Sequence, residues 1–340
     1  MKTQIGIALA LFVGSLYAGG TARIGVKVVD SETDEPIPKI KVHGGFRNYS
    51  RGWGIASKDN ADDGVTGHDG FCRLSGRTEA GHACCVVRNN AGYYDSGWYS
   101  FDYTEQSMLK LGRWLPDDVV ITVRLDRVIN PIPLSVAFSR PLRTEEDEMS
   151  FAEGENVALY DLLKNDWLPP LGKGEVADIS FSSKRTNLGS EPYNYPSGIR
   201  TNEFYRYDVQ VRFIGDGNGM KESMPPKEAG IKLRTAPETG YEPMRVCWTG
   251  RMSRTEYKDN SSDERCYFFR IRTELDELGK IKSAIYGKIY GDFKIVGKKN
   301  GIKGVSFLYY LNPNLNDRNL EWDRQHNLCP NTKDIGEPRP

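Results

Sequence analysis

The sequence predicts an all-β protein with two domains, a small β-sandwich followed by a larger β-rich domain of sandwich or jelly-roll type. Three observations lead to this prediction. At 340 residues the chain exceeds the length at which a single hydrophobic core usually stops growing. Its 35 glycines and 18 prolines favour short strands and turns over long helices. Apolar and polar residues alternate along Phe204–Ile214, which is the period of a half-buried strand.

Composition and charge narrow the classes of function. Hydrophobic residues make up 38% of the chain and aromatic residues 11%, as is typical of a folded protein. The formal net charge is zero, from 46 basic and 46 acidic residues, so the chain lacks the positive field that attracts phosphate backbones. We therefore expect no nucleic-acid partner.

Residues 1–20 are typical of a secretory signal peptide. A basic residue, Lys2, precedes the apolar run Ile5–Val13, and small residues end the segment. The apolar run is shorter than the roughly 20 residues that a membrane span requires, and no later stretch reaches that length. We therefore expect cleavage after Ala18 or Gly20, no transmembrane segment afterwards, and a secreted, periplasmic or cell-surface location.

Six cysteines in an exported chain predict disulfides, because oxidising compartments preserve them. We expect Cys72 to pair with Cys84 or Cys85, and Cys247 to pair with Cys266, since each pair would lie on neighbouring strands. Metal binding is the competing interpretation, but no CxxC pair occurs and the four histidines are scattered, so we predict no metal site. The disulfide candidates are Cys72, Cys84, Cys85, Cys247, Cys266 and Cys329.

The first domain after the signal peptide, residues 21–138, is predicted to consist of short strands. Asp69–Gly70 is a tight-turn signal, and the prolines at positions 36 and 38 place a loop after the first strand. Five or more strands separated by turns indicate a small β-sandwich. The expected strands are Ile24–Val29, Ile40–Val42, the stretch from Asp69–Gly70 to Leu74, Ala83–Arg88 and Val119–Leu125.

Four segments of this domain resemble the carboxypeptidase regulatory-like domains, whose fold is a transthyretin-like or prealbumin-like β-sandwich. The segments are VVDSETDEPIPKIKV, VTGHDGF, the AGYY turn and VITVRLDRV, and the resemblance covers about residues 21–130. It implies a non-catalytic accessory module of secreted and surface proteins. It implies no functional residues for this chain.

Acidic residues at three nearby positions, Asp59, Asp63 and Asp69, raise the hypothesis of a calcium site. The EF-hand pattern fails, because an alanine and a glycine occupy positions that need ligands. A solvated acidic turn is the preferred interpretation, and an irregular calcium site built by several loops is the alternative. Asp216 and Asn218 also suggest a calcium site, but short turns of the DxN type are common without metal. We otherwise expect no cofactor.

An acidic run, Glu145–Glu148, marks residues 139–152 as an exposed linker. The second domain is predicted to span residues 153–325, with a tail at residues 326–340.

The second domain opens with Asn156–Phe181, a stretch rich in turn residues. Val157–Leu163 is either a strand or the start of a short helix, because the hydrophobic periodicity of so few residues does not distinguish the two. Gly172–Lys173–Gly174 superficially resembles a phosphate loop. The spacing GxxxxGK followed by Ser or Thr is absent, so a plain turn is the preferred interpretation.

Further strands are expected downstream. Arg245–Trp248 and Cys266–Thr273 are predicted to pair with each other. Ser283–Val296 divides into an apolar face, which includes Ile285 and Phe293, and a face of tyrosines and charged residues. Asn300–Gly301 is the strongest hairpin signal of the chain, and it closes onto Ile302–Leu311.

This hairpin carries the candidate binding residues, Tyr286, Lys288, Tyr290 and Lys294. Lys280–Lys303 contains seven lysines and one acidic residue. Such a face would bind sugars by stacking, or acidic glycans by charge. The alternative is a sheet face that is solvated, with its tyrosines packed under loops.

A catalytic pattern is not found. Glu274-Leu275-Asp276 resembles the start of the carboxylate motif of family 16 glycosidases, but leucine and glycine follow where the acid/base should be. The segments DLLKNDWLPPLGKGEVAD and YYLNPNLNDRNLEWD resemble secreted bacterial proteins of unknown function, over about residues 155–323, and this implies no activity. We predict an exported, non-catalytic binding or structural protein with a glycan or surface-protein partner. The alternative is a secreted glycan hydrolase with unrecognised carboxylates.

Overall fold

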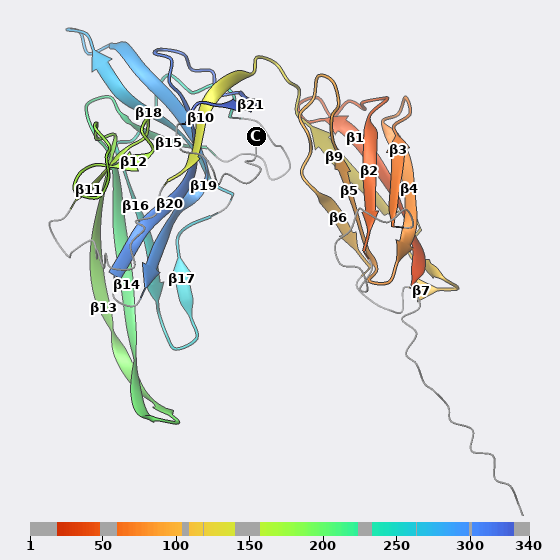
Figure 1. Cartoon of the computed structure of the whole chain (residues 1–340), viewed down its shortest axis with the longest axis horizontal. Coiled ribbons are helices and arrows are strands. Elements are labelled where there is room, and N and C mark those ends of the chain that lie inside the picture. Colours follow the sequence, from red (N-terminus) through yellow and green to blue (C-terminus); the bar gives the residue numbers. More distant parts are fainter. Residues whose placement is uncertain are drawn as a thin grey trace, which may run out of the picture. The chain divides into compact units, whose positions relative to one another are not determined.

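The computed structural model describes residues 19–47, 60–103, 109–117, 119–139, 157–223, 233–262, 264–298 and 301–329. These residues form strands and no helix, which confirms the all-β prediction (Figure 1). The chain divides into two compact units, Met1–Arg127 and Val128–Pro340. The predicted signal peptide up to residue 18 and the acidic run at 145–148 lie outside the described residues.

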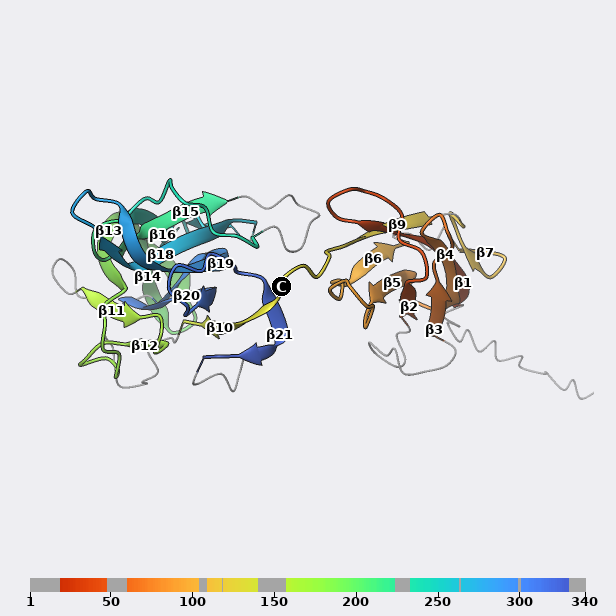
Figure 2. The ribbon, with the colours of Figure 1, turned by 90° about the horizontal axis from the view of Figure 1, so that it is seen from above.

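The first unit is a β-sandwich of two sheets. The view from above shows the two sheets as separate layers (Figure 2). One sheet joins β4 (Phe71–Thr78), β1 (Gly20–Asp30), β9 (Val119–Leu125), β8 (Arg113–Trp114) and β7 (Leu109–Lys110). The other joins β3 (Ala61–Val65), β2 (Lys41–Phe46), β5 (His82–Val87) and β6 (Tyr99–Asp102).

The core of the first unit follows the alternation of β1. Ile24, Val26 and Val28 are fully buried between the sheets, because successive side chains of a strand point to opposite faces. Trp114 completes the core, and its indole nitrogen donates to the carbonyl oxygen of Thr78 at 2.9 Å. Burial of each of these aliphatic side chains contributes roughly 1.5 to 3 kcal/mol.

The second unit is a larger sandwich of two six-stranded sheets. The first sheet has the order β15 (Gly219–Ser223), β18 (Cys266–Leu275), β19 (Ile281–Lys298), β20 (Gly301–Asn312), β10 (Ile132–Phe138) and β21 (Trp322–Asn327). The second has the order β12 (Asp166–Trp167), β11 (Ala158–Asp161), β13 (Ile179–Tyr195), β14 (Gly198–Phe213), β16 (Met244–Arg251) and β17 (Tyr257–Asp259).

Strand β10 belongs to the second unit, whereas the sequence prediction placed it in the first domain. It pairs with β20 and β21, and its Val136 is fully buried. A run of charged residues in the sequence need not mark a domain boundary. The division lies before β10, after Arg127.

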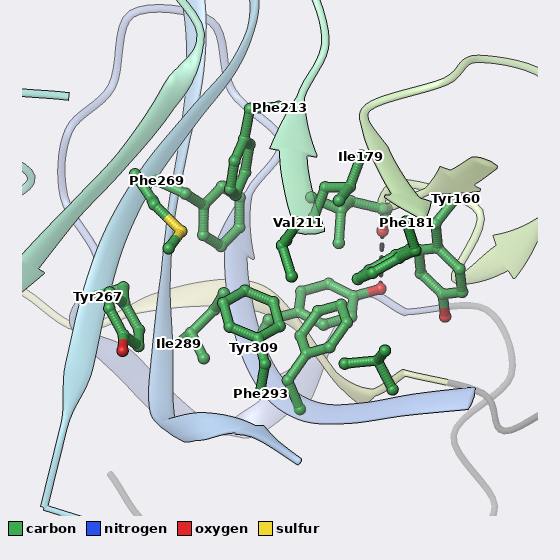
Figure 3. Packing of buried hydrophobic residues seen from close by; sticks show 14 of the residues in the cluster. Tyr160, Ile179, Phe181, Val211, Phe213, Tyr267, Phe269, Ile289, Phe293 and Tyr309 are labelled. Carbon is green, nitrogen blue, oxygen red and sulfur yellow. Dashed lines mark hydrogen bonds between the residues drawn. The ribbon is translucent and has the colours of Figure 1, made fainter. Parts of the chain in front are cut away.

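Aromatic and aliphatic side chains fill the space between the two sheets of the second unit (Figure 3). The predicted inward face of β14, which includes Val211 and Phe213, packs here against Ile289 and Phe293 of β19. The Tyr309 hydroxyl donates to the carbonyl oxygen of Leu162 at 2.8 Å, so this polar group is satisfied inside the core. Antiparallel pairing of β19 with β20 confirms the predicted hairpin.

The predicted pairing of Arg245–Trp248 with Cys266–Thr273 is wrong. Strand β16 pairs with β14 and β17, while β18 pairs with β15 and β19 in the other sheet. Strands β16 and β18, which are close in sequence, therefore lie in different sheets that face each other across the core.

No disulfide joins the cysteines in the described part of the chain, and all six are buried. The expected pairs are not formed, because Cys247 points into the core between the sheets whereas Cys266 packs on the opposite face of its own sheet. Cys72 and Cys85 point into the first core from facing sheets. Burial raises the pKa of Cys72 to about 11 and that of Cys85 to about 12, which favours the neutral thiol over the nucleophilic thiolate.

Candidate functional site

The predicted tyrosine and lysine face of β19 is covered. Tyr286 is 5% exposed and Lys288 is fully buried. Leu233, Ala236 and Leu320 pack over Tyr286. The predicted alternation is correct up to Tyr290, but both faces of the strand are buried there. These residues therefore do not form an open stacking surface. Beyond Tyr290 the register shifts, and Asp292, which was predicted on the tyrosine face, instead bonds Tyr267 of the core between the sheets.

Lys288 lies between two aromatic rings beneath this cover. Its Nζ is 5.1 Å from the ring centroid of Tyr290 and 5.0 Å from that of Tyr310. Within the described residues this Nζ has no hydrogen-bond partner. Burial lowers the pKa of Lys288 to about 7, although the carboxylate of Glu321 acts in the opposite direction.

Lys294, the fourth predicted binding residue, is exposed and lines a groove. The groove has a volume of about 340 Å³ and lies between the β16–β17 side of one sheet and β19 of the other. Phe293 is 1% exposed and forms part of the core, so it closes the groove from below. The lining residues are Trp248, Thr249, Asp259, Ser261, Phe293, Lys294 and Ile295.

Hydrogen bonds hold the polar wall of the groove on β16. The side-chain oxygen of Asn260 accepts from the Trp248 backbone N–H at 2.7 Å, and the Asn260 N–H donates back to the Trp248 carbonyl at 3.1 Å. The Asp259 carboxylate accepts from the Ser261 backbone N–H at 2.9 Å. The guanidinium of Arg206 stacks on the Trp248 ring at 4.5 Å. These contacts join β16 to β14 and to the end of β17, and together they position the wall.

A buried carboxylate, Asp292 of β19, connects the floor of the groove to β16 and to the segment after β17. It is 2% exposed, and it accepts from Arg265 at 2.9 Å, from Arg245 at 3.2 Å and from the Tyr267 hydroxyl at 2.9 Å. It also accepts from the backbone N–H of Ser262 at 3.3 Å. The hydrogen bond with Asp292 raises the pKa of Arg265, which therefore stays charged. Asp292 directly precedes the groove residues Phe293 and Lys294.

The predicted turn around Gly172–Lys173–Gly174 wraps around the chain's own carboxylates. The N–H of Lys173 donates to Asp166 at 3.3 Å, and the N–H groups of Glu175 and Val176 both donate to Asp161 at 3.0 Å. The backbone donors that would bind a phosphate are therefore already used.

Arg272 joins Asp161 to a second buried acid, Asp178. Its guanidinium lies 2.8 Å from Asp161 and 2.9 Å from Asp178. Burial opposes ionisation of Asp161, but the backbone donors and Arg272 together outweigh it, and its pKa lies below the ordinary value. Burial raises the pKa of Asp178. Both acids are 1 to 2% exposed, so they stabilise the fold and are not accessible to a substrate.

Three residues of the calcium hypothesis, Asp63, Asp69 and Asn218, have protein partners. Asp63 lies 2.7 Å from the Nδ1 of His43, Asp69 accepts from the Phe71 N–H at 3.1 Å, and Asn218 accepts from the Thr273 N–H at 2.9 Å. Asp59 lies outside the described residues. In the part of the chain that the structure describes, no group of three or more His, Cys, Asp or Glu side chains could hold a metal ion.

The glycosidase-like carboxylates do not line the groove. Asp276 accepts from the N–H of Leu278 and of Lys280 in the exposed turn between β18 and β19. Glu274 pairs with Lys282 at 3.6 Å. Asp259 is the one carboxylate among the groove-lining residues, whereas glycoside hydrolysis ordinarily requires two acids that face each other across the bond.

No known family matches the chain, and no curated protein matches it. Among solved structures, a DUF3823 family protein from Parabacteroides merdae aligns with 85% of this chain and 96% of its own chain, at 8% identity and a TM-score of 0.20. At this TM-score the similarity supports no statement about function. Across the described residues no helix has the length and apolar character needed to cross a membrane.

Proposed function

We propose that the chain is an exported, non-catalytic binding protein whose second unit binds carbohydrate in the groove beside β19. The groove itself carries this proposal. Its volume of about 340 Å³ is at the small end of ligand sites, which suits a short stretch of a sugar chain.

The chemistry of the lining fits sugar hydroxyl groups. Asp259 supplies acceptors, Lys294 supplies donors, and the Thr249 hydroxyl can do both. The Ser261 hydroxyl donates to Asp259 at 2.5 Å, so it offers a ligand its acceptor lone pairs. Ile295, which packs on the core that contains the buried Phe293, offers an apolar floor for the C–H face of a sugar ring. A mixed polar rim over an apolar floor fixes both the position and the orientation of such a ligand.

Export is supported by the apolar leader within residues 1–20. The resemblance of residues 21–130 to carboxypeptidase regulatory-like domains supports an accessory role for the first sandwich at a secreted, periplasmic or cell-surface location. The absence of disulfides from the described residues does not oppose export, because burial protects the six thiols from oxidation.

A glycan array probed with the mature chain tests this proposal. We expect Lys294→Ala and Asp259→Asn each to weaken binding of the retained glycans by about tenfold or more, since a hydrogen bond to a charged group is worth about 1.5 to 3 kcal/mol. Lys184→Ala is the matched control, because Lys184 is exposed on β13 and does not line the groove. Failure to retain any glycan, or retention unchanged in both groove variants, overturns the proposal.

A further inference from the structure

Strands β13 and β14 extend beyond the sheet that contains them. Strand β11 pairs with β13 only along Ile179–Phe181, and β16 pairs with β14 only along Tyr205–Arg212. Residues 187–204 therefore form a two-stranded ribbon with no further strand beside it among the described residues. We call these residues the arm; Figure 1 shows it as the long green hairpin that projects from the second unit.

The arm exposes apolar side chains that a purely structural hairpin would not need. Ile199 is 77% exposed, Tyr195 is 48% exposed and Leu188 is 45% exposed. An isolated two-stranded ribbon is marginally stable in water. Exposed apolar and aromatic side chains on such a projection are typical of an interaction surface.

One face of the arm combines tyrosines with arginines. The Arg200 guanidinium lies 3.9 Å from the ring centroid of Tyr195, and Arg254, which follows β16, lies 5.9 Å from that of Tyr193. The two tyrosine rings are 6.4 Å apart at an interplanar angle of 82°. Rings at this angle form a corner, so they do not provide the flat platform on which successive sugar rings would stack.

The arginines of this face lack acidic partners, unlike those nearer the sandwich. Arg185 pairs with Glu203 at 3.2 Å, and Arg206 pairs with Asp208 at 2.6 Å. Within the described residues Arg200 bonds only the Ser197 hydroxyl, at 3.3 Å, and no ion pair involves Arg254. Glu191 is the one carboxylate on the same face of the arm. Because Glu203 is paired with Arg185, this face keeps the two arginines against Glu191 alone, and its positive excess of one charge favours an acidic partner.

We propose that the arm docks an extended acidic segment of a partner protein. Tyrosine and arginine are the residues enriched at the centres of protein interfaces. Guanidinium groups bind carboxylates through paired hydrogen bonds, and the free edges of the two strands offer backbone groups to an extended chain. This surface is distinct from the groove, so the inference does not rest on carbohydrate binding.

Fluorescence anisotropy with a labelled peptide of alternating Glu and Thr residues tests the inference on the full chain. We expect saturable binding that weakens with salt, and a loss of about tenfold in affinity for each of Arg200→Gln and Arg254→Gln. A Lys and Thr peptide should not bind. Lys27→Gln is the control variant, because Lys27 is exposed in the first unit.

Three results distinguish peptide docking on the arm from binding in the groove, from no binding and from binding of an acidic polysaccharide. Lys294→Ala should leave peptide binding unchanged, which distinguishes the arm from the groove. No binding of the acidic peptide, or binding unaffected by both arginine variants, overturns the proposal. Tighter binding of polygalacturonate than of the peptide, lost in Arg200→Gln, would assign the arm to an acidic polysaccharide and also overturn protein docking.

Discussion

Replacing Asp292 with alanine should lower the free energy of unfolding by about 3 to 5 kcal/mol, because removal of one partner from a buried ion pair leaves uncompensated charge. The guanidinium groups of Arg245 and Arg265 converge on this carboxylate, and the Tyr267 hydroxyl would lose its acceptor. Urea denaturation followed by tryptophan fluorescence measures the change. Asp216→Ala, in an exposed turn, should stay within about 0.5 kcal/mol of the parent.

The same substitution should also disturb the groove. Asp292 accepts from the N–H of Ser262, beside the wall residue Ser261, and it precedes the floor residue Phe293. We therefore expect Asp292→Ala to lose glycan binding even under conditions in which it remains folded. A loss of stability below about 1 kcal/mol would contradict the role given to the Asp292 network.

Replacing Lys288 with methionine should stabilise the protein near neutral pH. The side chains have similar lengths, and methionine removes a fully buried amine whose Nζ has no hydrogen-bond partner among the described residues. The pKa of Lys288 falls from 10.5 to about 7 on folding. Since one pKa unit corresponds to about 1.4 kcal/mol, we expect a gain of roughly 3 to 5 kcal/mol at and below neutral pH.

The sign of the pH dependence follows from proton binding. Between a pH of about 7 and 10.5 the unfolded chain holds the Lys288 proton and the folded chain does not, so stability rises with pH across this window. Below it both forms are protonated and the cost of burying the charge is fully present. Glu321 and Cys266 favour that charge, whereas Arg234 and Arg324 oppose it.

Urea denaturation near pH 6 and near pH 9 measures this effect. The parent protein should be more stable at the higher pH, and Lys288→Met should remove that contribution. Lys282→Met is the control, because the Lys282 side chain is 70% exposed. A Lys288→Met variant that is less stable than the parent at both pH values would contradict the account.

Local patterns predicted strands well, because alternation is a property of one segment. The inward residues of β14, such as Val209 and Val211, and those of β19, such as Ile289, occupy the core as expected. Alternation does not show whether the second face of a strand is open. Tyr286 is covered by Leu233 and Leu320, which are distant in sequence, so its burial could not be predicted from the pattern around it.

The groove was only partly predicted, because its lining residues come from segments that are distant in sequence. Lys294 was identified from its charged neighbourhood, whereas Asp259 ends the short strand β17 and Ser261 follows it, in a polar stretch of sequence that has no motif. Packing of two sheets brings the three together. The cysteine pairs and the pairing of β16 with β18 failed because adjacency along the chain was taken for adjacency in a sheet.

A crystal structure of the full chain with an oligosaccharide that it retains on the array tests the central claim most directly. We predict electron density for a sugar in the groove, with its hydroxyl groups in hydrogen-bond contact with Asp259 and Lys294 and one ring face over Ile295. A sugar bound on the arm or on the first unit, with the groove empty, would contradict the claim.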